Sequence, residues 1–166
     1  MALSPGAALG SRIAAASLLA LFAAASGAQT RFAVSADGQE VADSTTRLTW
    51  RRCVEGMRWD GKTCGGKAAT YKYAGAKQAA ETAASGAKAW RIPTREELVA
   101  LVDKTSKKKP LIDAKAFPNT PKAAFWAIRE GSDDDLNAWL VSFSTGRVSG
   151  NAGQKKFPLR LVRSGG

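Results

Sequence analysis

The sequence predicts an α+β domain in which an antiparallel sheet is combined with two helices from the middle of the chain. Short segments with alternating apolar residues, typical of strands, stand toward both ends of the chain. Between them lie one alanine-rich segment and one segment that begins with a helix-capping pattern. Strands followed by helices and then by strands are typical of an α+β fold. We expect its first and last strands to pair.

The first 28 residues have the features of a secretory signal peptide. Arg12 supplies a short positive region, residues 13–25 are apolar, and residues 26–28 form a small-residue cleavage signal. The alternative is a membrane anchor, but the apolar run is shorter than the ~20 residues that cross a bilayer. We therefore expect residues 29–166 to form a single exported domain, periplasmic or extracellular, with no transmembrane segment in the mature chain.

The N-terminal half of this domain predicts several short strands and one loop. Leu48 and Trp50 lie two residues apart, so a strand through them places both side chains on one face. Trp59, Asp60 and Gly61 have the composition of a turn at the tip of the loop. The predicted elements are strands over 31–35, 40–43 and 47–53, the loop over 54–66, and an extended piece over 71–73.

Two helices are predicted in the middle of the chain. Residues 75–85 are rich in alanine, which has the highest helix propensity. Thr94 and Glu97 form a capping box, in which each side chain bonds the other residue's backbone amide, so a second helix begins at Thr94. The apolar face of that helix is formed by Leu98, Leu101 and Val102.

The remaining strands lie around and after the second helix. We expect them over 90–92, 124–128, 137–143, 147–149 and 155–163. In the last of these, Phe157, Leu159 and Leu161 alternate with other residues and therefore share one face.

The two cysteines, Cys53 and Cys64, predict a disulfide. An exported protein meets an oxidising environment, where an even pair of cysteines normally bonds. The loop is short, so the expected stabilisation is about 2–3 kcal/mol. A zinc site is a poor alternative, because two thiolates do not complete one and the chain has no histidine.

The chain is strongly basic. Its formal net charge is +11, and removal of the segment that contains Arg12 lowers it to +10. Such a charge attracts polyanions, for example acidic glycans, nucleic acid or an anionic surface. An equally weighted alternative is that the charge keeps an exported protein soluble.

An ordered series of motifs resembles a known family. The motifs lie within residues 50–53, 56–64, 90–98, 116–121, 125–126, 138–146 and 159–163. Together they resemble the C-terminal domain of the Legionella collagen-like adhesin, over about residues 41–163. The resemblance implies an exported bacterial domain with a possible C-type-lectin-like fold, and an association with sulfated polysaccharides and host surfaces. The collagen-like stalk of that adhesin is missing from this chain, so trimerisation driven by the stalk does not carry over.

Basic side chains are the candidate binding residues, because arginine and lysine bind sulfates and phosphates through charge and hydrogen bonds. Trp59 is a further candidate for stacking on a sugar ring, and the alternative, which carries somewhat more weight, is that it packs beneath its own loop. The alternative for Lys107 to Lys109 is a solvated loop with no binding role. The candidates are Arg51, Arg52, Arg58 and Lys62 around the disulfide loop, then Lys107, Lys108 and Lys109, and finally Lys155, Lys156 and Arg160.

The sequence does not favour an enzyme. No histidine is present for a nucleophile–base pair, and we expect no cofactor and no metal. Calcium at Asp133, Asp134 and Asp135 is a minor alternative, because a charge run on a loop is usually only solvated. We expect a non-enzymatic binding module for acidic or sulfated polysaccharide or another polyanion at the cell envelope. The alternative is a periplasmic structural or assembly protein that binds an envelope protein, and nucleic acid is not expected to be the physiological partner.

Overall fold

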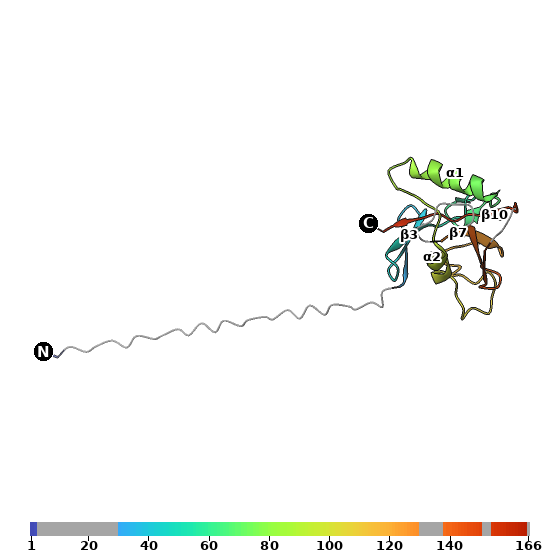
Figure 1. Cartoon of the computed structure of the whole chain (residues 1–166). Coiled ribbons are helices and arrows are strands. Elements are labelled where there is room, and N and C mark those ends of the chain that lie inside the picture. Colours follow the sequence, from blue (N-terminus) through green and yellow to red (C-terminus); the bar gives the residue numbers. More distant parts are fainter. Residues whose placement is uncertain (3–29, 130–137, 151–153, 166) are drawn as a thin grey trace.

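The computed structural model describes residues 1–2, 30–129, 138–150 and 154–165 (Figure 1). Within these residues, two helices and several antiparallel sheets confirm the α+β class. Two predictions lie outside the described residues: the signal peptide, except for its first two residues, and the calcium alternative at Asp133–Asp135.

The helices are α1 (Tyr73–Ala84) and α2 (Arg95–Ala100). The strands before them are β1 (Phe32–Val34), β2 (Glu40–Asp43), β3 (Leu48–Arg51), β4 (Arg58–Trp59), β5 (Cys64–Gly65) and β6 (Thr70–Tyr71). The strands after them are β7 (Ala124–Ile128), β8 (Ala138–Ser142), β9 (Val148–Gly150), β10 (Phe157–Pro158) and β11 (Val162–Ser164).

The strands form four small antiparallel sheets. The largest has the order β1-β2-β3-β11, and a second has the order β7-β8-β9. The pairs β10-β6 and β4-β5 form the other two. The prediction that the first and last strands pair is wrong, because among the described residues β1 pairs with β2 while β11 pairs with β3. In that register Val162 lies opposite Trp50, which places two fully buried side chains together.

The segment predicted as one strand over 155–163 is broken into β10 and β11. Pro158 has no amide hydrogen to donate, so the ladder cannot continue through it on that side. The chain then crosses the interior, where Leu159, Arg160 and Leu161 are all fully buried. Core residues therefore cover both faces of this segment, and the expected alternation of buried and exposed residues fails.

Two further predictions in the first half of the chain need correction. Tyr73 begins α1 and does not belong to the preceding extended piece, which is limited to β6. The predicted loop over 54–66 contains a small hairpin, because Trp59 in β4 pairs with Cys64 in β5.

The structure confirms the capping box at the start of α2. The Glu97 amide donates to Thr94 Oγ1 at 3.2 Å, and the Thr94 amide donates to Glu97 Oε2 at 2.8 Å. Arg91 also donates to both oxygens of Glu97, at 2.7 Å each. The helix is short and has Leu101 as its C-cap, yet Leu98 and Leu101 remain buried.

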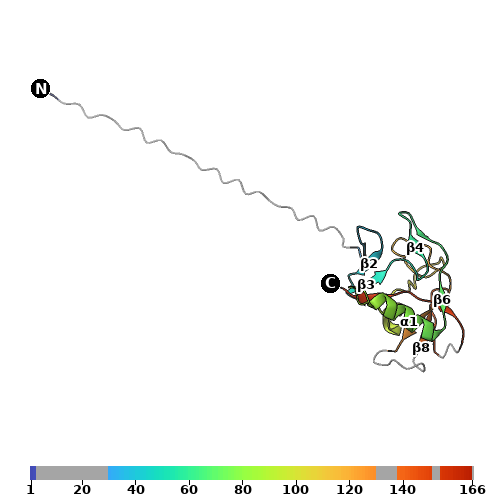
Figure 2. The ribbon, with the colours of Figure 1, turned by 90° about the horizontal axis from the view of Figure 1, so that it is seen from above.

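One part of the core forms around Trp126 in β7. Its Nε1 donates to the Tyr71 carbonyl at 2.8 Å, and its ring lies edge-on to Phe157 with 5.3 Å between centroids. Helix α1 contributes Tyr73, whose ring centroid is also 5.3 Å from that of Trp126, and the small buried residue Ala76. Helix α1 lies along the top of the domain in Figure 1 and in front of the other elements in Figure 2, which is seen from above, and this outer position fits its narrow buried stripe of alanines.

A second part of the core joins the β1-β2-β3-β11 sheet to α2 and β8. At its edge the carboxylate of Asp43 is buried and receives two bonds from Arg31, from Nε at 2.9 Å and from Nη2 at 2.6 Å. The same Nη2 donates to the carbonyl of Ala100, at the end of α2. This ion pair therefore ties the first strands to the second helix.

The Asp43 carboxylate makes the stability of the fold depend on pH. Burial by itself would raise the pKa of Asp43, but the hydrogen bonds from Arg31 and the Thr45 amide outweigh it and lower the pKa. A carboxyl whose pKa is lower when folded stabilises the fold above its unfolded pKa, near 3.9, and loses that contribution as the pH falls. We therefore expect the free energy of unfolding to decrease below about pH 4.

The Asp43→Asn variant tests the source of this dependence. Urea unfolding at a series of pH values should show a shallower loss of stability on acidification in the variant than in the natural chain. Other paired carboxylates, such as Glu97, leave a residual slope in both proteins. If the two curves of stability against pH run parallel, Asp43 does not contribute as described.

Candidate functional site

The disulfide between Cys53 and Cys64 is formed, as the sequence predicted. Its sulfur atoms are 2.03 Å apart and its Cα atoms are 5.4 Å apart. The bond closes the loop that contains the β4-β5 hairpin. Asn119 Nδ2 donates to the Cys64 carbonyl at 2.9 Å, so the loop is also attached to the segment before β7.

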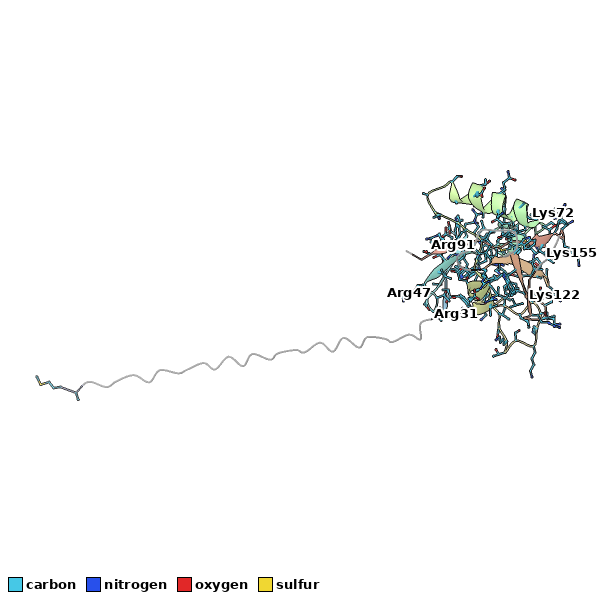
Figure 3. The ribbon with its side chains drawn as sticks, in the orientation of Figure 1. Arg31, Arg47, Lys72, Arg91, Lys122 and Lys155 are labelled. Carbon is cyan, nitrogen blue, oxygen red and sulfur yellow. A yellow bond between two sulfur atoms is a disulfide. The ribbon has the colours of Figure 1, made fainter. Side chains whose placement is uncertain are left out.

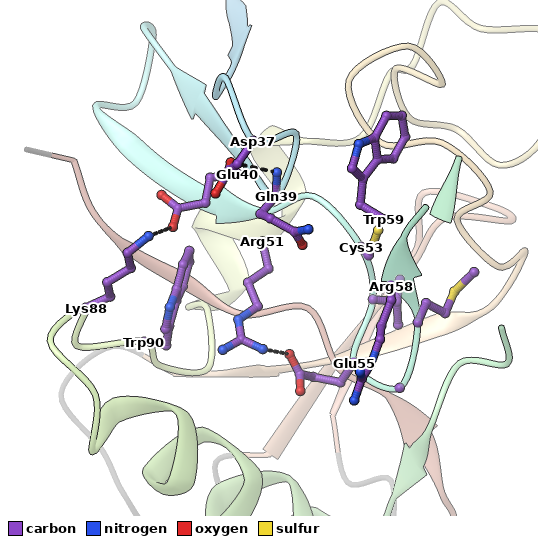
Figure 4. Close-up of a pocket in the computed structure, with 13 residues that line it drawn as sticks. Asp37, Gln39, Glu40, Arg51, Cys53, Glu55, Arg58, Trp59, Lys88 and Trp90 are labelled. Carbon is purple, nitrogen blue, oxygen red and sulfur yellow. Dashed lines mark hydrogen bonds and ion pairs between the residues drawn. The ribbon is translucent and has the colours of Figure 1, made fainter. Parts of the chain in front are cut away.

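A cleft of about 660 Å³ opens beside this loop (Figure 4). Its walls come from the turn before β2, from the end of β3 with the disulfide loop, and from the segment that leads to Trp90. Three acidic side chains line it, namely Asp37, Glu40 and Glu55. Three basic side chains also line it, namely Arg51, Arg58 and Lys88.

Most charges in this cleft neutralise one another. Arg51 Nη1 donates to Glu55 Oε1 at 3.0 Å, and Lys88 pairs with Glu40 (Figure 4). Arg163 also donates to Glu40, at 2.8 Å. Burial would raise the pKa of Glu40, but these two cations lower it, so Glu40 is ionised at neutral pH. The three acidic and three basic side chains that line the cleft balance in charge, and Arg51 is engaged by Glu55.

Arg52 does not face solvent, contrary to the prediction. Its Nε donates to the Ala116 carbonyl at 3.1 Å, and its Nη2 donates to the Lys115 carbonyl at 3.2 Å. Its guanidinium lies 3.8 Å from the ring centroid of Trp59. Trp59 is half-buried and also lies close to Gly38, so it packs against its own surroundings. These two residues hold the disulfide loop against the 115–116 segment.

Arg160 is also misassigned as a binding residue, because its side chain is fully buried. It donates to the carbonyls of Arg51 and Arg52, the former at 2.8 Å, and to Thr120 Oγ1 at 2.8 Å. Its guanidinium lies 4.8 Å from the ring centroid of Phe117. Burial lowers the pKa of Arg160 to about 9, so the group remains charged at neutral pH. Arg160 therefore joins three segments of the interior.

The other basic candidates are exposed, and the structure places them in separate regions. Arg58 and Lys62 lie on the β4-β5 hairpin and its turn. Lys107, Lys108 and Lys109 lie in the loop after α2, and Lys155 and Lys156 lie before β10. Phe157 pairs with Tyr71, and Lys156 and Lys72 are the chain neighbours of this pair. Figure 3 labels Lys72 and Lys155 close together on one side of the molecule.

A groove of about 690 Å³ lies beside Lys156, and we call it the lysine groove. It is formed by stretches within residues 57–70, 119–124 and 156–158. Lys67 and Lys156 are its charged lining residues, and no carboxylate lines it. Lys67 was not among the predicted binding residues, because it lies just outside the loop that the disulfide closes. Pairing of β6 with β10 brings this part of the chain beside Lys156.

The described residues contain neither a metal-binding cluster of acidic, cysteine or histidine side chains nor a membrane-spanning helix. No group of three or more histidine, cysteine, aspartate or glutamate side chains within them is arranged to hold a metal ion. None of the helices formed by these residues has the length and apolar character needed to cross a membrane.

Comparison with known proteins gives one match. The family model described as the Lcl C-terminal domain matches residues 39–163. No curated protein and no solved structure matches the chain.

Proposed function

Because the chain belongs to the Lcl C-terminal domain family, we propose that it is a non-enzymatic, adhesin-like module that binds acidic or sulfated polysaccharide or another polyanion. The observation that supports this proposal is the unpaired basic charge on its surface. Among the described residues, no ion pair involves the exposed side chains Arg58, Lys62, Lys107, Lys108, Lys109, Lys155 and Lys156.

Several acidic side chains, unlike these basic ones, are held in ion pairs. Glu40, Asp43, Glu55 and Glu97 are all paired with arginine or lysine, so much of the negative charge is neutralised within the fold. The excess positive charge is therefore carried by flexible lysines that face solvent. A long polyanion can contact several such groups at once, and their separate weak attractions then add to one binding energy.

Export belongs to the same proposal. The family and the intramolecular disulfide are both consistent with an exported protein, since disulfides persist in oxidising compartments. We propose the periplasm or the cell exterior as its location. The C-type-lectin-like relationship suggested by the motif series is also a proposal, supported by the α+β class and the antiparallel sheets.

The alternative function, binding of an envelope protein, is favoured by one observation. Strands β1 and β9 each lie at the edge of a sheet, and each exposes a large apolar side chain, Val34 and Val148 respectively. Unpaired strand edges with exposed apolar residues are surfaces on which another chain can add a strand.

We expect the mature protein to be retained on immobilised heparin and not on a neutral polysaccharide. Replacement of Lys107, Lys108 and Lys109 by glutamine should lower the salt concentration that elutes the protein, because fewer cations oppose the sulfates. Replacement of Lys155 and Lys156 should act in the same direction. The matched controls replace the same lysines by arginine, which keeps the charge and should keep the retention.

Equal retention on heparin and on the neutral matrix would contradict the proposal, as would retention that does not change between low and physiological salt. A protein captured from envelope extract whose binding is lost when Val34 or Val148 is replaced by lysine would favour the alternative instead.

A further inference from the structure

The lysine groove has the dimensions and lining of a small-molecule site, and it differs in chemistry from the rest of the basic surface. Its volume of about 690 Å³ lies within the range of about 300–1,000 Å³ that is typical of ligand pockets. We infer that the lysine groove binds an amphiphilic anion, a single molecule with an apolar chain and a carboxylate or phosphate head. This site goes beyond the polyanion binding proposed above.

The floor of the groove is apolar. Its lining includes the half-buried residues Met57, Ala123 and Phe157 and the buried residue Pro158. Phe157 is held in place because its ring packs edge-on against Trp126, and Met57 and Ala123 pack against the second part of the core. A preformed apolar floor gains free energy when it covers the hydrocarbon part of a ligand.

Two of the polar side chains that line the groove are already engaged within the protein. Asn119 already donates to the Cys64 carbonyl at 2.9 Å. Thr120 donates to the Phe117 carbonyl at 2.9 Å and accepts from Arg160 at 2.8 Å. Hydroxyl groups of a sugar that lie against these engaged groups or the apolar lining would lose bonds to water without replacing them, and such unpaired groups are costly. The lining therefore favours a hydrocarbon body over a saccharide.

The rim supplies the charge for an anionic head. Lys67 and Lys156 line the groove, and both are exposed. Lys122 stands between the lining residues Pro121 and Ala123, and Lys72 directly follows Tyr71, which pairs with Phe157. Among the described residues, none of these lysines is in an ion pair, so their charge is available to a ligand. Figure 3 shows Lys72, Lys122 and Lys155 on the same side of the molecule.

Calorimetric titration of the mature protein with three dodecyl amphiphiles tests the inference. Laurate and dodecyl phosphate carry the two anionic heads, and dodecyl maltoside is the neutral control of equal chain length, all used below their micelle concentrations. We expect one anionic amphiphile to bind per chain and the maltoside to bind at least about tenfold more weakly, a difference of about 1.4 kcal/mol. The two anions distinguish a carboxylate ligand from a phosphate ligand.

Two variants locate the site. K67Q/K156Q should weaken laurate or phosphate binding by about tenfold and leave the weak maltoside binding unchanged. T70W, at an exposed residue of β6 that lines the groove, should block the chain of all three ligands. The control K107Q/K108Q/K109Q removes more positive charge than K67Q/K156Q, but from residues that do not line the groove. It should leave laurate binding unchanged and weaken heparin retention.

Several results would overturn the inference. They are equal affinity for the three amphiphiles, many bound molecules per chain, and unchanged laurate binding in both K67Q/K156Q and T70W. Binding of an acidic peptide without any binding of laurate or dodecyl phosphate would also exclude an amphiphile. Because heparin retention is measured separately, failure of this site and failure of the polyanion proposal are distinguishable. Unfolding curves for each variant ensure that lost binding is not lost folding.

Discussion

Replacement of Arg160 by alanine should lower the free energy of unfolding by about 3–4 kcal/mol. The change removes the donors that satisfy the carbonyls of Arg51 and Arg52 and the hydroxyl of Thr120. Each buried acceptor left without a partner costs about 1–3 kcal/mol, and the lost side chain also leaves a cavity. Relief from burying the charge offsets part of this loss, since burial of the guanidinium is itself unfavourable.

Urea unfolding of Arg160→Ala and Lys156→Ala provides a matched comparison, since each variant removes one cation from the same segment. Lys156 is exposed, so its variant should unfold at the midpoint of the natural chain. Arg160→Lys should also be destabilised, because an ammonium cannot reproduce the planar fork that reaches three acceptors. A stable Arg160→Ala protein that has lost heparin retention would instead make Arg160 a surface binding residue.

The double variant Cys53→Ser/Cys64→Ser should be less stable than the natural protein by about 2–3 kcal/mol. The disulfide lowers the conformational entropy of the unfolded chain, because it closes a loop between two residues that are 11 positions apart. The loop also bears the Cys64 carbonyl that accepts from Asn119, so its loosening should extend to the segment before β7.

Reduction provides the internal control for this prediction. A reducing agent should destabilise the natural protein to the level of the double variant and should have no effect on the variant. Under non-reducing conditions, the intact mass of the natural protein should be lower than after reduction by the mass of two hydrogen atoms. Unfolding midpoints that do not differ with and without reductant would show that the bond does not stabilise the fold.

The sequence predicted most of the local structure because its signals are local. Thr94 and Glu97 are three residues apart, and their mutual hydrogen bonds require nothing from the rest of the chain. The strand around Trp126 and the helix over residues 75–85 were also found, with shifts of one or two residues at some of their ends. The pairing of Cys53 with Cys64 follows from the number of cysteines and the expected compartment.

The topology could not be predicted in the same way, because it depends on contacts between distant segments. The choice of β3 as the partner of β11 requires Val162 to meet Trp50, and nothing in either local sequence specifies that meeting. The break between β10 and β11 could have been anticipated from Pro158, since proline interrupts a ladder. The missed signal there is the proline itself.

The candidate site was predicted less well than the fold. The local sequence around an arginine or lysine does not show whether its side chain is buried or exposed in the folded protein. Arg52 and Arg160 satisfy backbone carbonyls from segments more than sixty positions away in the chain. The lysine groove likewise depends on three stretches that meet only in the folded protein. Lys156 was a predicted binding residue and lines this groove, whereas its partner on the rim, Lys67, was not predicted.

The position of β11 also bears on the order of events during folding. β3 lies between β2 and β11, so the edge of β3 that faces β11 stays open until Val162–Ser164 are available. The buried residues Leu159, Arg160 and Leu161 arrive at the same stage, because they immediately precede β11. A pairing of such high sequence separation is slow to form, since the intervening chain must first be closed into a loop. Completion of this sheet and core therefore awaits residues 159–164, and until they arrive β3 is a free edge on which another chain could pair.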